Sequence, residues 1–179
     1  NGNVAELGSV SRLQIIHNSP DPTVDIYVNG ENAVPGLTFR SATGMIDLPT
    51  RTPIDIAVVP AGADIGSAVA TLEGVVLDDG KVYLAMASGV VGDATTPFNV
   101  VINDMGRDRA ADAAEVDLVL FHGAPDAPTV DVVVEDGPVL FDNIEYGTFS
   151  DYLGVAPAAY VLDVTPADDN TTVVKKYDA

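Results

Sequence analysis

The sequence predicts an all-β protein built from two tandem immunoglobulin-like β-sandwich domains. Three observations lead to this fold class. Short apolar segments alternate with polar residues at period 2, which is typical of half-buried strands. Turn-forming residues are frequent among the 179 positions, with 16 Gly and 12 Pro. A long stretch of sequence also occurs twice in the same order, which indicates a duplicated structural unit.

The repeat is clearest between residues 17–28, HNSPDPTVDIYV, and residues 122–134, HGAPDAPTVDVVV. With one inserted residue, Ala127, the two segments match at eight of twelve positions. Weaker matches follow in the same order, and both copies reach a Pro-Ala pair, Pro60-Ala61 and Pro166-Ala167. Because the order is kept throughout, we interpret the pattern as a duplication.

The first copy contains a series of strand signals separated by turn signals. Val24, Ile26 and Val28 alternate with Asp25 and Tyr27, and an Asn-Gly pair typical of tight hairpins follows. In this strand the alternation predicts that the two polar residues lie on the solvent side. The other strands expected in this copy are 13–17, 54–58, 69–72, 82–88 and 98–102.

The second copy repeats the first strands but is expected to be incomplete within this chain. Strands are predicted at 117–122, 130–134, 160–164 and 171–177. No segment corresponds to 82–88 or 98–102, so two core-forming strands are predicted to be missing. A sandwich without a central strand exposes apolar core and unpaired backbone groups. Either the polypeptide continues with further domains, or a neighbouring molecule donates a strand, for example from residues 3–7.

The sequence divides into a first domain at residues 1–106, a linker at 107–112 and a second domain at 113–179. The stretch 104–115, DMGRDRAADAAE, is polar and poor in core-forming residues, as linkers are. A helical turn is conceivable only at 107–115, the segment closest to a helical apolar pattern. No apolar run is long enough for a membrane span.

The charge balance excludes some classes of partner. Eight Lys and Arg stand against 27 Asp and Glu, for a formal net charge of -19. A nucleic-acid-binding face requires clustered basic residues, so no nucleic-acid partner is expected. The chain has no Cys, which excludes disulfides and thiolate metal sites. An acidic, turn-rich composition also suits a surface in a saline setting, where salt screens its self-repulsion.

The two histidines are the first candidate functional residues, because each precedes a Pro-Asp turn in its copy. The turn residues are His17, Pro20, Asp21, His122, Pro125 and Asp126. One reading makes each histidine a metal ligand together with the neighbouring aspartate. The other reading is structural: the imidazole bonds the backbone and fixes the exit of the strand. Since each copy has one histidine, the structural reading is favoured, and no metal is assigned to the histidines.

Asp104, Asp108 and Asp112 recur every four residues and are the candidate calcium ligands, since Ca²⁺ takes several oxygen ligands. The alternative is a solvated acidic linker, because no EF-hand loop pattern is present. No cofactor is expected otherwise. No catalytic residue is assigned either: Ser11 and Ser19 lie near His17 in sequence, but neither sits in a Gly-x-Ser-x-Gly motif. The sequence therefore predicts a non-catalytic protein.

The repeated motifs resemble the bacterial and archaeal "domain of unknown function 4397" family. The matching segments are 17–21, 24–28, 122–126, 130–134 and 146–152, and the first copy departs at 39–45, which lacks the Gly and Tyr of that segment. The resemblance implies tandem β-sandwiches in secreted or envelope proteins, without an established activity or recognised catalytic residues. Family members usually carry further strands after the point that this chain reaches.

The function expected from these observations is that of an extracellular or cell-surface structural or adhesive protein. Its sharper form is the subunit of a surface filament assembled by strand exchange, in which the chain associates with itself. The alternative is a carbohydrate- or calcium-binding module within a larger secreted protein.

Overall fold

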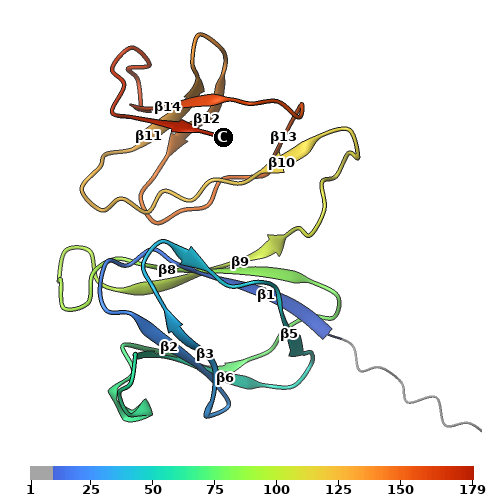
Figure 1. Ribbon diagram of the computed structural model, residues 1–179, viewed down its shortest axis with the longest axis vertical. Coiled ribbons are helices and arrows are strands. Elements are labelled where there is room, and N and C mark those ends of the chain that lie inside the picture. The colour runs from blue at the N-terminus through green and yellow to red at the C-terminus, as the bar shows by residue number, and fades with distance from the viewer. Residues whose placement is uncertain (1–9) are drawn as a thin grey trace, which may run out of the picture. The chain divides into compact units, whose positions relative to one another are not determined.

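A computed structural model describes residues 10–179 of the chain, which divides into two compact units, residues 1–107 and 108–179. We call them unit 1 and unit 2. The division falls at the start of the segment predicted as a linker. Both units consist of β-strands, as predicted (Figure 1).

Unit 1 is a sandwich of two β-sheets in which most neighbouring strands are antiparallel. The first sheet has the order β4-β1-β8-β9, and β5 also pairs with β1. The second has the order β3-β2-β6-β7. The strands of the first sheet are β1 (Val10–His17), β4 (Ser41–Ala42), β5 (Ile46–Pro49), β8 (Val82–Ser88) and β9 (Asn99–Gly106); those of the second are β2 (Val24–Val28), β3 (Glu31–Leu37), β6 (Ile54–Pro60) and β7 (Ala70–Val75).

The core of unit 1 lies between these sheets and follows from the predicted alternation. Leu13 and Ile15 of β1 are buried, whereas Gln14 between them is only partly covered. They pack with buried residues of the opposite sheet such as Ile26 and Val58. Strand β8 runs parallel to β1, from Arg12 beside Val82 to His17 beside Ala87. All seven residues of β8 are buried, as expected for a central strand.

The predicted hairpin turn joins β2 to β3. Asn29 and Gly30 both have positive φ, 50° and 82°, which the tight turn requires and which these two residue types tolerate. A short 3₁₀ turn, η1 (Ile65–Ser67), follows β6. The segment 107–115 forms bends and one turn closed by Glu115 N donating to Asp112 O, instead of a helix.

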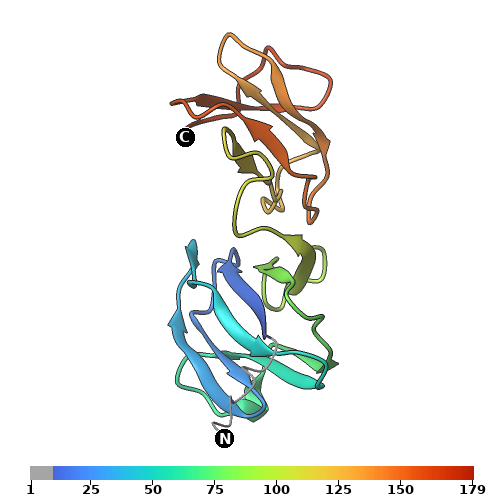
Figure 2. The ribbon, with the colours of Figure 1, turned by 90° about the vertical axis from the view of Figure 1, so that its right-hand side faces the viewer.

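Unit 2 repeats one sheet of unit 1 in full and the other in part. Its four-stranded sheet has the order β12-β11-β14-β15, and a separate pair is formed by β10 and β13. This pair lies opposite the four-stranded sheet in both views (Figure 1, Figure 2). The strands are β10 (Val116–Leu118), β11 (Val130–Val134), β12 (Val139–Ile144), β13 (Leu153–Val155), β14 (Val161–Pro166) and β15 (Lys175–Asp178).

The registers confirm that these strands are equivalent. Val24 pairs with Leu37 and Pro60 in unit 1, and Val130 pairs with Ile144 and Pro166 in unit 2. The equivalences are β1 with β10, β2 with β11, β3 with β12, β5 with β13, β6 with β14 and β7 with β15. Residues 108–179 contain no strand equivalent to β8 or β9. Among the described residues, no helix has the length and apolar character required to cross a membrane.

Candidate functional site

Each histidine of the repeat is buried beneath its turn and bonded to backbone. His17 is fully buried, with Nε2 2.9 Å from the carbonyl oxygen of Pro22 and Nδ1 3.4 Å from the backbone nitrogen of Ser19. A carbonyl only accepts and a backbone N–H only donates, so Nε2 carries the hydrogen and Nδ1 accepts. Both ring nitrogens are therefore engaged in hydrogen bonds with the loop that follows β1.

His122 makes the same two contacts in unit 2. Its Nε2 lies 2.9 Å from the carbonyl oxygen of Pro128, and its Nδ1 accepts from the N–H of Ala124 at 3.4 Å. The identical pairing after 105 residues supports the structural reading of the histidine. The remaining predicted turn residues, Pro20, Asp21, Pro125 and Asp126, are exposed on the loops that carry the two backbone partners.

The sequence analysis did not predict a second feature shared by the two copies. Each copy has a buried aspartate, in β2 of unit 1 and in β11 of unit 2. Asp25 and Asp131 were expected on the solvent side but are 7% and 2% exposed. Asp25 accepts from the N–H groups of Gly36 and Gly62, at 2.7 and 3.2 Å. These bonds, Gly36 first, lower the pKa of Asp25 despite its burial.

Asp131 holds the equivalent bulge in unit 2 by accepting from the N–H of Asn143 at 2.7 Å. Gly36 and Asn143 both have positive φ, 65° and 56°, at a register shift of the edge strand. One sequence signal could have indicated these bulges. In each copy, the strand after the hairpin turn contains a residue type that tolerates positive φ, Gly36 in unit 1 and Asn143 in unit 2. The carboxylate therefore secures a bulge.

The calcium candidates do not form one site among the described residues, where no group of three His, Cys, Asp or Glu side chains could hold a metal. Asp104 lies on β9 of unit 1, where its carboxylate binds Lys81 Nζ at 3.1 Å. In unit 2, Asp108 pairs with Arg109 at 3.6 Å, and Asp112 accepts from the N–H of Ala114 at 2.9 Å. Each carboxylate thus has a contact of its own.

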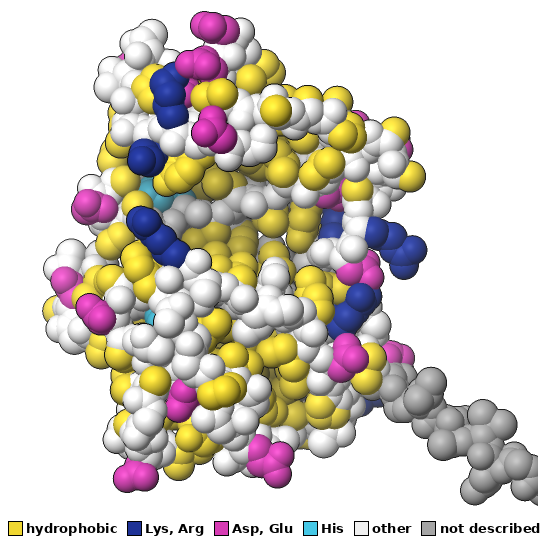
Figure 3. Space-filling model, viewed as in Figure 1, with side chains coloured by type: hydrophobic (Ala, Val, Ile, Leu, Met, Phe, Trp, Pro, Cys, Tyr) yellow, Lys and Arg dark blue, Asp and Glu magenta, His cyan; other side chains and the backbone are white. Residues whose placement is uncertain are grey.

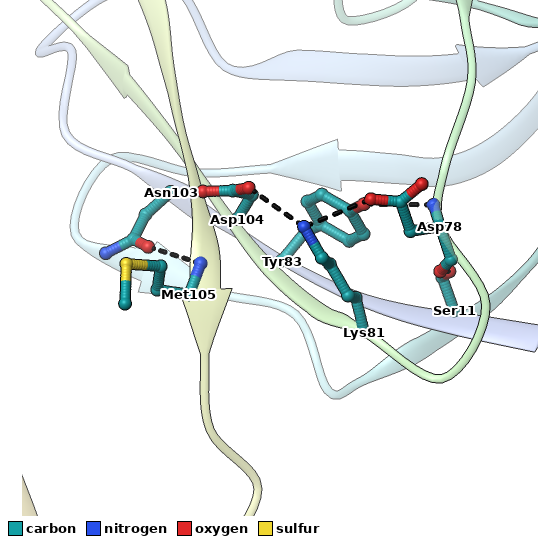
Figure 4. A network of polar contacts seen from close by, with 7 residues as sticks. All are labelled: Ser11, Asp78, Lys81, Tyr83, Asn103, Asp104 and Met105. Atoms are coloured by element: carbon teal, nitrogen blue, oxygen red, sulfur yellow. Dashed lines mark hydrogen bonds and ion pairs between the residues drawn. The ribbon is translucent and has the colours of Figure 1, made fainter.

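Lys81 is the centre of the polar network around Asp104 (Figure 4). Its ammonium group also binds Asp78 at 3.0 Å, and these two carboxylates, Asp78 first, raise the pKa of Lys81. The backbone of Asp78 is held in turn: its N–H donates to the Tyr83 hydroxyl at 3.0 Å, and its carbonyl accepts from the Ser11 hydroxyl. The network closes the loop between β7 and β8.

The two serines near His17 do not form a nucleophile pair with it. Ser19 is buried, contacts the imidazole through its backbone N–H, and donates its hydroxyl to the Asp21 carbonyl at 3.2 Å. Ser11 is also buried and its hydroxyl bonds Asp78. A nucleophilic serine requires a hydroxyl that faces both a base and a substrate, and neither residue has this arrangement.

The feature of unit 2 with the clearest chemical consequence is the edge of β10 that faces away from β13. Even-numbered residues bond the β13 side: Leu120 and Ser150 exchange hydrogen bonds, and His122 N donates to Thr148 O at 3.1 Å. Val119 and Phe121 point their backbone groups to the other edge, and no backbone hydrogen bond joins them to the described residues. In unit 1 this edge of the equivalent strand is occupied by β8.

The side chains beneath this edge are less covered than their equivalents in unit 1. Leu13 and Ile15 of β1 are buried, at 4% and 7% exposure, whereas Leu118 and Leu120 are half-buried. The same change occurs on the facing sheet, where Ile56 and Val58 are buried and Leu162 and Val164 are half-buried. The second unit therefore has both an unpaired edge and an incompletely covered core.

Comparison with known proteins agrees with the repeat. No curated protein matches the chain. The family model described as "Domain of unknown function (DUF4397)" matches residues 11–132 and 116–179, which together cover both units. The chain therefore belongs to the DUF4397 family.

Proposed function

We propose that this protein is a non-catalytic structural component of the cell exterior that associates with copies of itself by strand addition at the open edge of β10. The observation that carries the proposal is the contrast between β1, which has β8 beside it, and β10, where no strand pairs on the equivalent side within residues 10–179. An unpaired edge is a template for another strand.

The register in unit 1 specifies the strand that would fit. Arg12 to His17 pair in parallel with Val82 to Ala87, and the equivalent residues of unit 2 are 117–122. The added strand would run parallel to β10, bond the backbone of Val119 and Phe121, and cover Leu118 and Leu120. Burying these leucines provides about 25 cal/mol for each Å² of apolar surface removed from water.

The chain's own candidate donor is the segment 3–7 of a second copy, which lies outside the described residues. It contains five residues, and an extended segment of that length spans about 17 Å, so it would pair with part of the acceptor edge. Donor and acceptor surfaces are different parts of the chain, so the contact is heterologous and repeats head to tail. The expected product is a filament.

Placement outside the cell is part of the same proposal and is supported by the acidic surface. Figure 3 shows Asp and Glu side chains spread over the visible face of both units, where they outnumber Lys and Arg. A net charge of -19 keeps individual chains soluble through mutual repulsion, so polymerisation would require specific backbone pairing. High salt would favour it by screening that repulsion.

The test is assembly of the purified 179-residue chain, followed by sedimentation velocity over a range of concentrations and by electron microscopy. We expect concentration-dependent polymers that are lost when Asn1–Leu7 is deleted. Val119→Pro should also abolish them, since proline removes the N–H that an added strand would bond. Val119→Ala keeps that N–H and is the matched control, which should still polymerise.

Two outcomes contradict the proposal. A stable monomer at all concentrations would mean that the edge of β10 is not a site for a second copy, as expected if further domains of the same polypeptide cover it. Polymers that survive both the deletion and Val119→Pro would show that association uses another surface. Circular dichroism of each variant establishes that the variants remain folded.

A further inference from the structure

Unit 1 carries a surface hollow of about 400 Å³ on the outer face of its β2-β6-β7 sheet. It is lined by Tyr27, Asn29, Gly30, Asp55, Ala57, Ile65, Thr71 and Glu73. Its volume lies within the usual range of small-molecule sites, roughly 300–1,000 Å³. It differs from the apolar cavity of about 30 Å³ inside the core of unit 1, which is too small to hold a ligand.

The hollow follows from the residues in one row of the sheet. Tyr27 pairs with Ala57, and Ala57 pairs with Thr71, so their side chains share the face opposite to the core. The central position holds a small alanine between two larger neighbours, which leaves a depression. Ile65 of η1 also lines the hollow.

The next row supplies polar groups that are held in place by backbone contacts. Asn29 Oδ1 accepts from Asp55 N at 2.9 Å, and Asp55 Oδ1 accepts from Gly74 N at 2.7 Å. Each side chain therefore retains a second polar atom beyond the one engaged. Among the described residues, no hydrogen bond engages the side chains of Tyr27, Thr71 or Glu73.

In unit 2 the equivalent row of residues is filled differently, so the fold of the sheet does not depend on a hollow at this place. Val133, Asp163 and Lys176 occupy the register positions of Tyr27, Ala57 and Thr71. There Lys176 Nζ binds Asp163 at 3.0 Å and Glu135 at 2.5 Å, so an ion-pair cluster lies across the equivalent face. The hollow with free hydroxyl, amide and carboxylate groups is a feature of unit 1.

The donor set identifies the class of ligand. Tyr27 and Thr71 hydroxyls and the Asn29 amide can donate, while Asp55 and Glu73 can only accept. A metal cation would use only the acceptors, whereas a polyhydroxylated ring both donates and accepts. The two carboxylates and the absence of Lys and Arg from the lining disfavour anionic ligands. Tyr27 and Ile65 add apolar surface for the face of a ring.

We infer that this hollow binds a neutral pyranose unit of a polysaccharide, with Tyr27 as the surface on which the ring packs. Asp55, Glu73 and Asn29 bond its hydroxyl groups from one side and Thr71 from the other. This gives a location and a ligand class to sugar binding, and it is independent of association through β10.

The experiment is titration of the ¹⁵N-labelled chain, carrying Val119→Pro to keep it monomeric, with neutral oligosaccharides of glucose, galactose, mannose and N-acetylglucosamine. Oligogalacturonate and CaCl₂ alone form separate arms. We expect at least one neutral sugar to shift the resonances of residues 27, 55, 57, 71 and 73 at millimolar concentration. Tyr27→Val, which introduces the residue found in unit 2, should weaken binding by about tenfold, or 1.4 kcal/mol.

Two further variants separate binding from folding. Glu73→Gln keeps the size of an exposed side chain and should reduce affinity several-fold, while Tyr177→Val removes an exposed tyrosine of unit 2 and should leave affinity unchanged. The inference is overturned if no neutral sugar shifts these resonances. It is also overturned if Tyr27→Val binds as tightly as the unaltered chain, or if the hollow takes up oligogalacturonate or Ca²⁺ instead.

Discussion

His17 and His122 make the same pair of hydrogen bonds in the two units, one from Nε2 to a proline carbonyl and one to Nδ1 from a backbone N–H. Both distances agree between the units, 2.9 and 3.4 Å. The histidine therefore joins the end of one strand to the loop before the next through two hydrogen bonds to the backbone. This role explains its position ahead of each Pro-Asp turn.

Replacing His17 with alanine should destabilise unit 1 by about 1–3 kcal/mol, because the half-buried carbonyl of Pro22 and the buried N–H of Ser19 lose their partner. His17→Gln should recover part of this loss, since its amide can both donate and accept. Urea unfolding monitored by amide resonances of unit 1 provides the measurement. A loss of stability equal in the alanine and glutamine variants would contradict the hydrogen-bonding role.

The second prediction concerns acid sensitivity of the Asp25 bulge. Hydrogen bonds from Gly36 and Gly62 lower the pKa of Asp25 in the folded state. The folded pKa is below the unfolded value, so the stabilisation is present above about pH 4 and is lost as the pH falls through the folded pKa. Asp25→Asn should remove this part of the pH dependence.

We therefore expect Asp25→Asn to be clearly less stable than the unaltered chain at pH 7 and closer to it at pH 2. Asp47→Asn changes an exposed carboxylate on β5 and is the matched control, which should show no such convergence. Urea unfolding at several pH values makes the comparison. If the difference between Asp25→Asn and the unaltered chain stays constant with pH, the ionised form of Asp25 is not what secures the bulge.

The turn before β15 contains a carboxyl group, that of Asp169, whose pKa is strongly lowered. The hydroxyl groups of Thr171 and Thr172, both 2.6 Å from Asp169, and the Thr171 N–H lower the pKa of Asp169 to about 2. Its contribution to stability is present above the ordinary carboxyl pKa and disappears as the pH falls through 2. Carbon-detected NMR titration of the side chain measures this pKa directly.

Thr171→Val and Thr172→Val each remove one hydroxyl donor and should raise the pKa of Asp169, Thr171 more than Thr172. The double variant should move the pKa of Asp169 towards the ordinary value near 4 but leave it lower, because the backbone N–H of residue 171 still donates to the carboxylate. An unchanged pKa in the double variant would mean that these hydroxyl groups do not bond the carboxylate in solution.

Strands such as β2 and β11 were predictable because they depend on local patterns that the duplication displays twice, whereas β3, β4, β5, β12 and β13 were not among the predicted strands. The alternation around Val24 and Val130 and the Asn29-Gly30 turn are visible in the sequence itself. Burial of Asp25 was not predictable from alternation alone, because its N–H donors come from a bulge of β3, 11 residues away, and from the turn after β6, 37 residues away. Alternation assigns a polar residue to the surface unless tertiary hydrogen bonds compensate its burial.

The hollow and the polar network of Lys81 depend on register between strands that are distant in sequence. Ala57 forms the floor of the hollow only because Tyr27 and Thr71 lie beside it on the two neighbouring strands. Asp104 belonged to a regular spacing that indicated calcium, yet its neighbour in space is Lys81. Side-chain spacing along the chain does not reveal such partners, since β-strands align residues across the sheet.

Salt should stabilise the whole protein. A net charge of -19 on 179 residues makes the folded chain repel itself, and added salt shortens the range of that repulsion. We expect the midpoint of thermal unfolding to rise by several degrees between 0.02 and 0.5 M NaCl. A flat or falling midpoint would show that screening of attractive ion pairs such as Lys81 with Asp78 outweighs screening of the repulsion. CaCl₂ at matched ionic strength tests whether a bound ion adds to the effect.

A matched pair of substitutions in the two copies can measure how much stability unit 2 lacks at its open edge. Leu13 and Leu118 are equivalent residues of β1 and β10, but Leu13 is buried and Leu118 half-buried. Leu13→Ala should cost about 2–5 kcal/mol, as for a leucine enclosed in a core, and Leu118→Ala distinctly less. Hydrogen exchange of amides in β2 and β11 reports each unit separately. An added strand would cover Leu118. The loss of unfolding free energy caused by Leu118→Ala should therefore increase in the assembled protein, while the loss caused by Leu13→Ala stays constant. Equal costs in the dilute monomer would mean that unit 2 already encloses its core without a further strand.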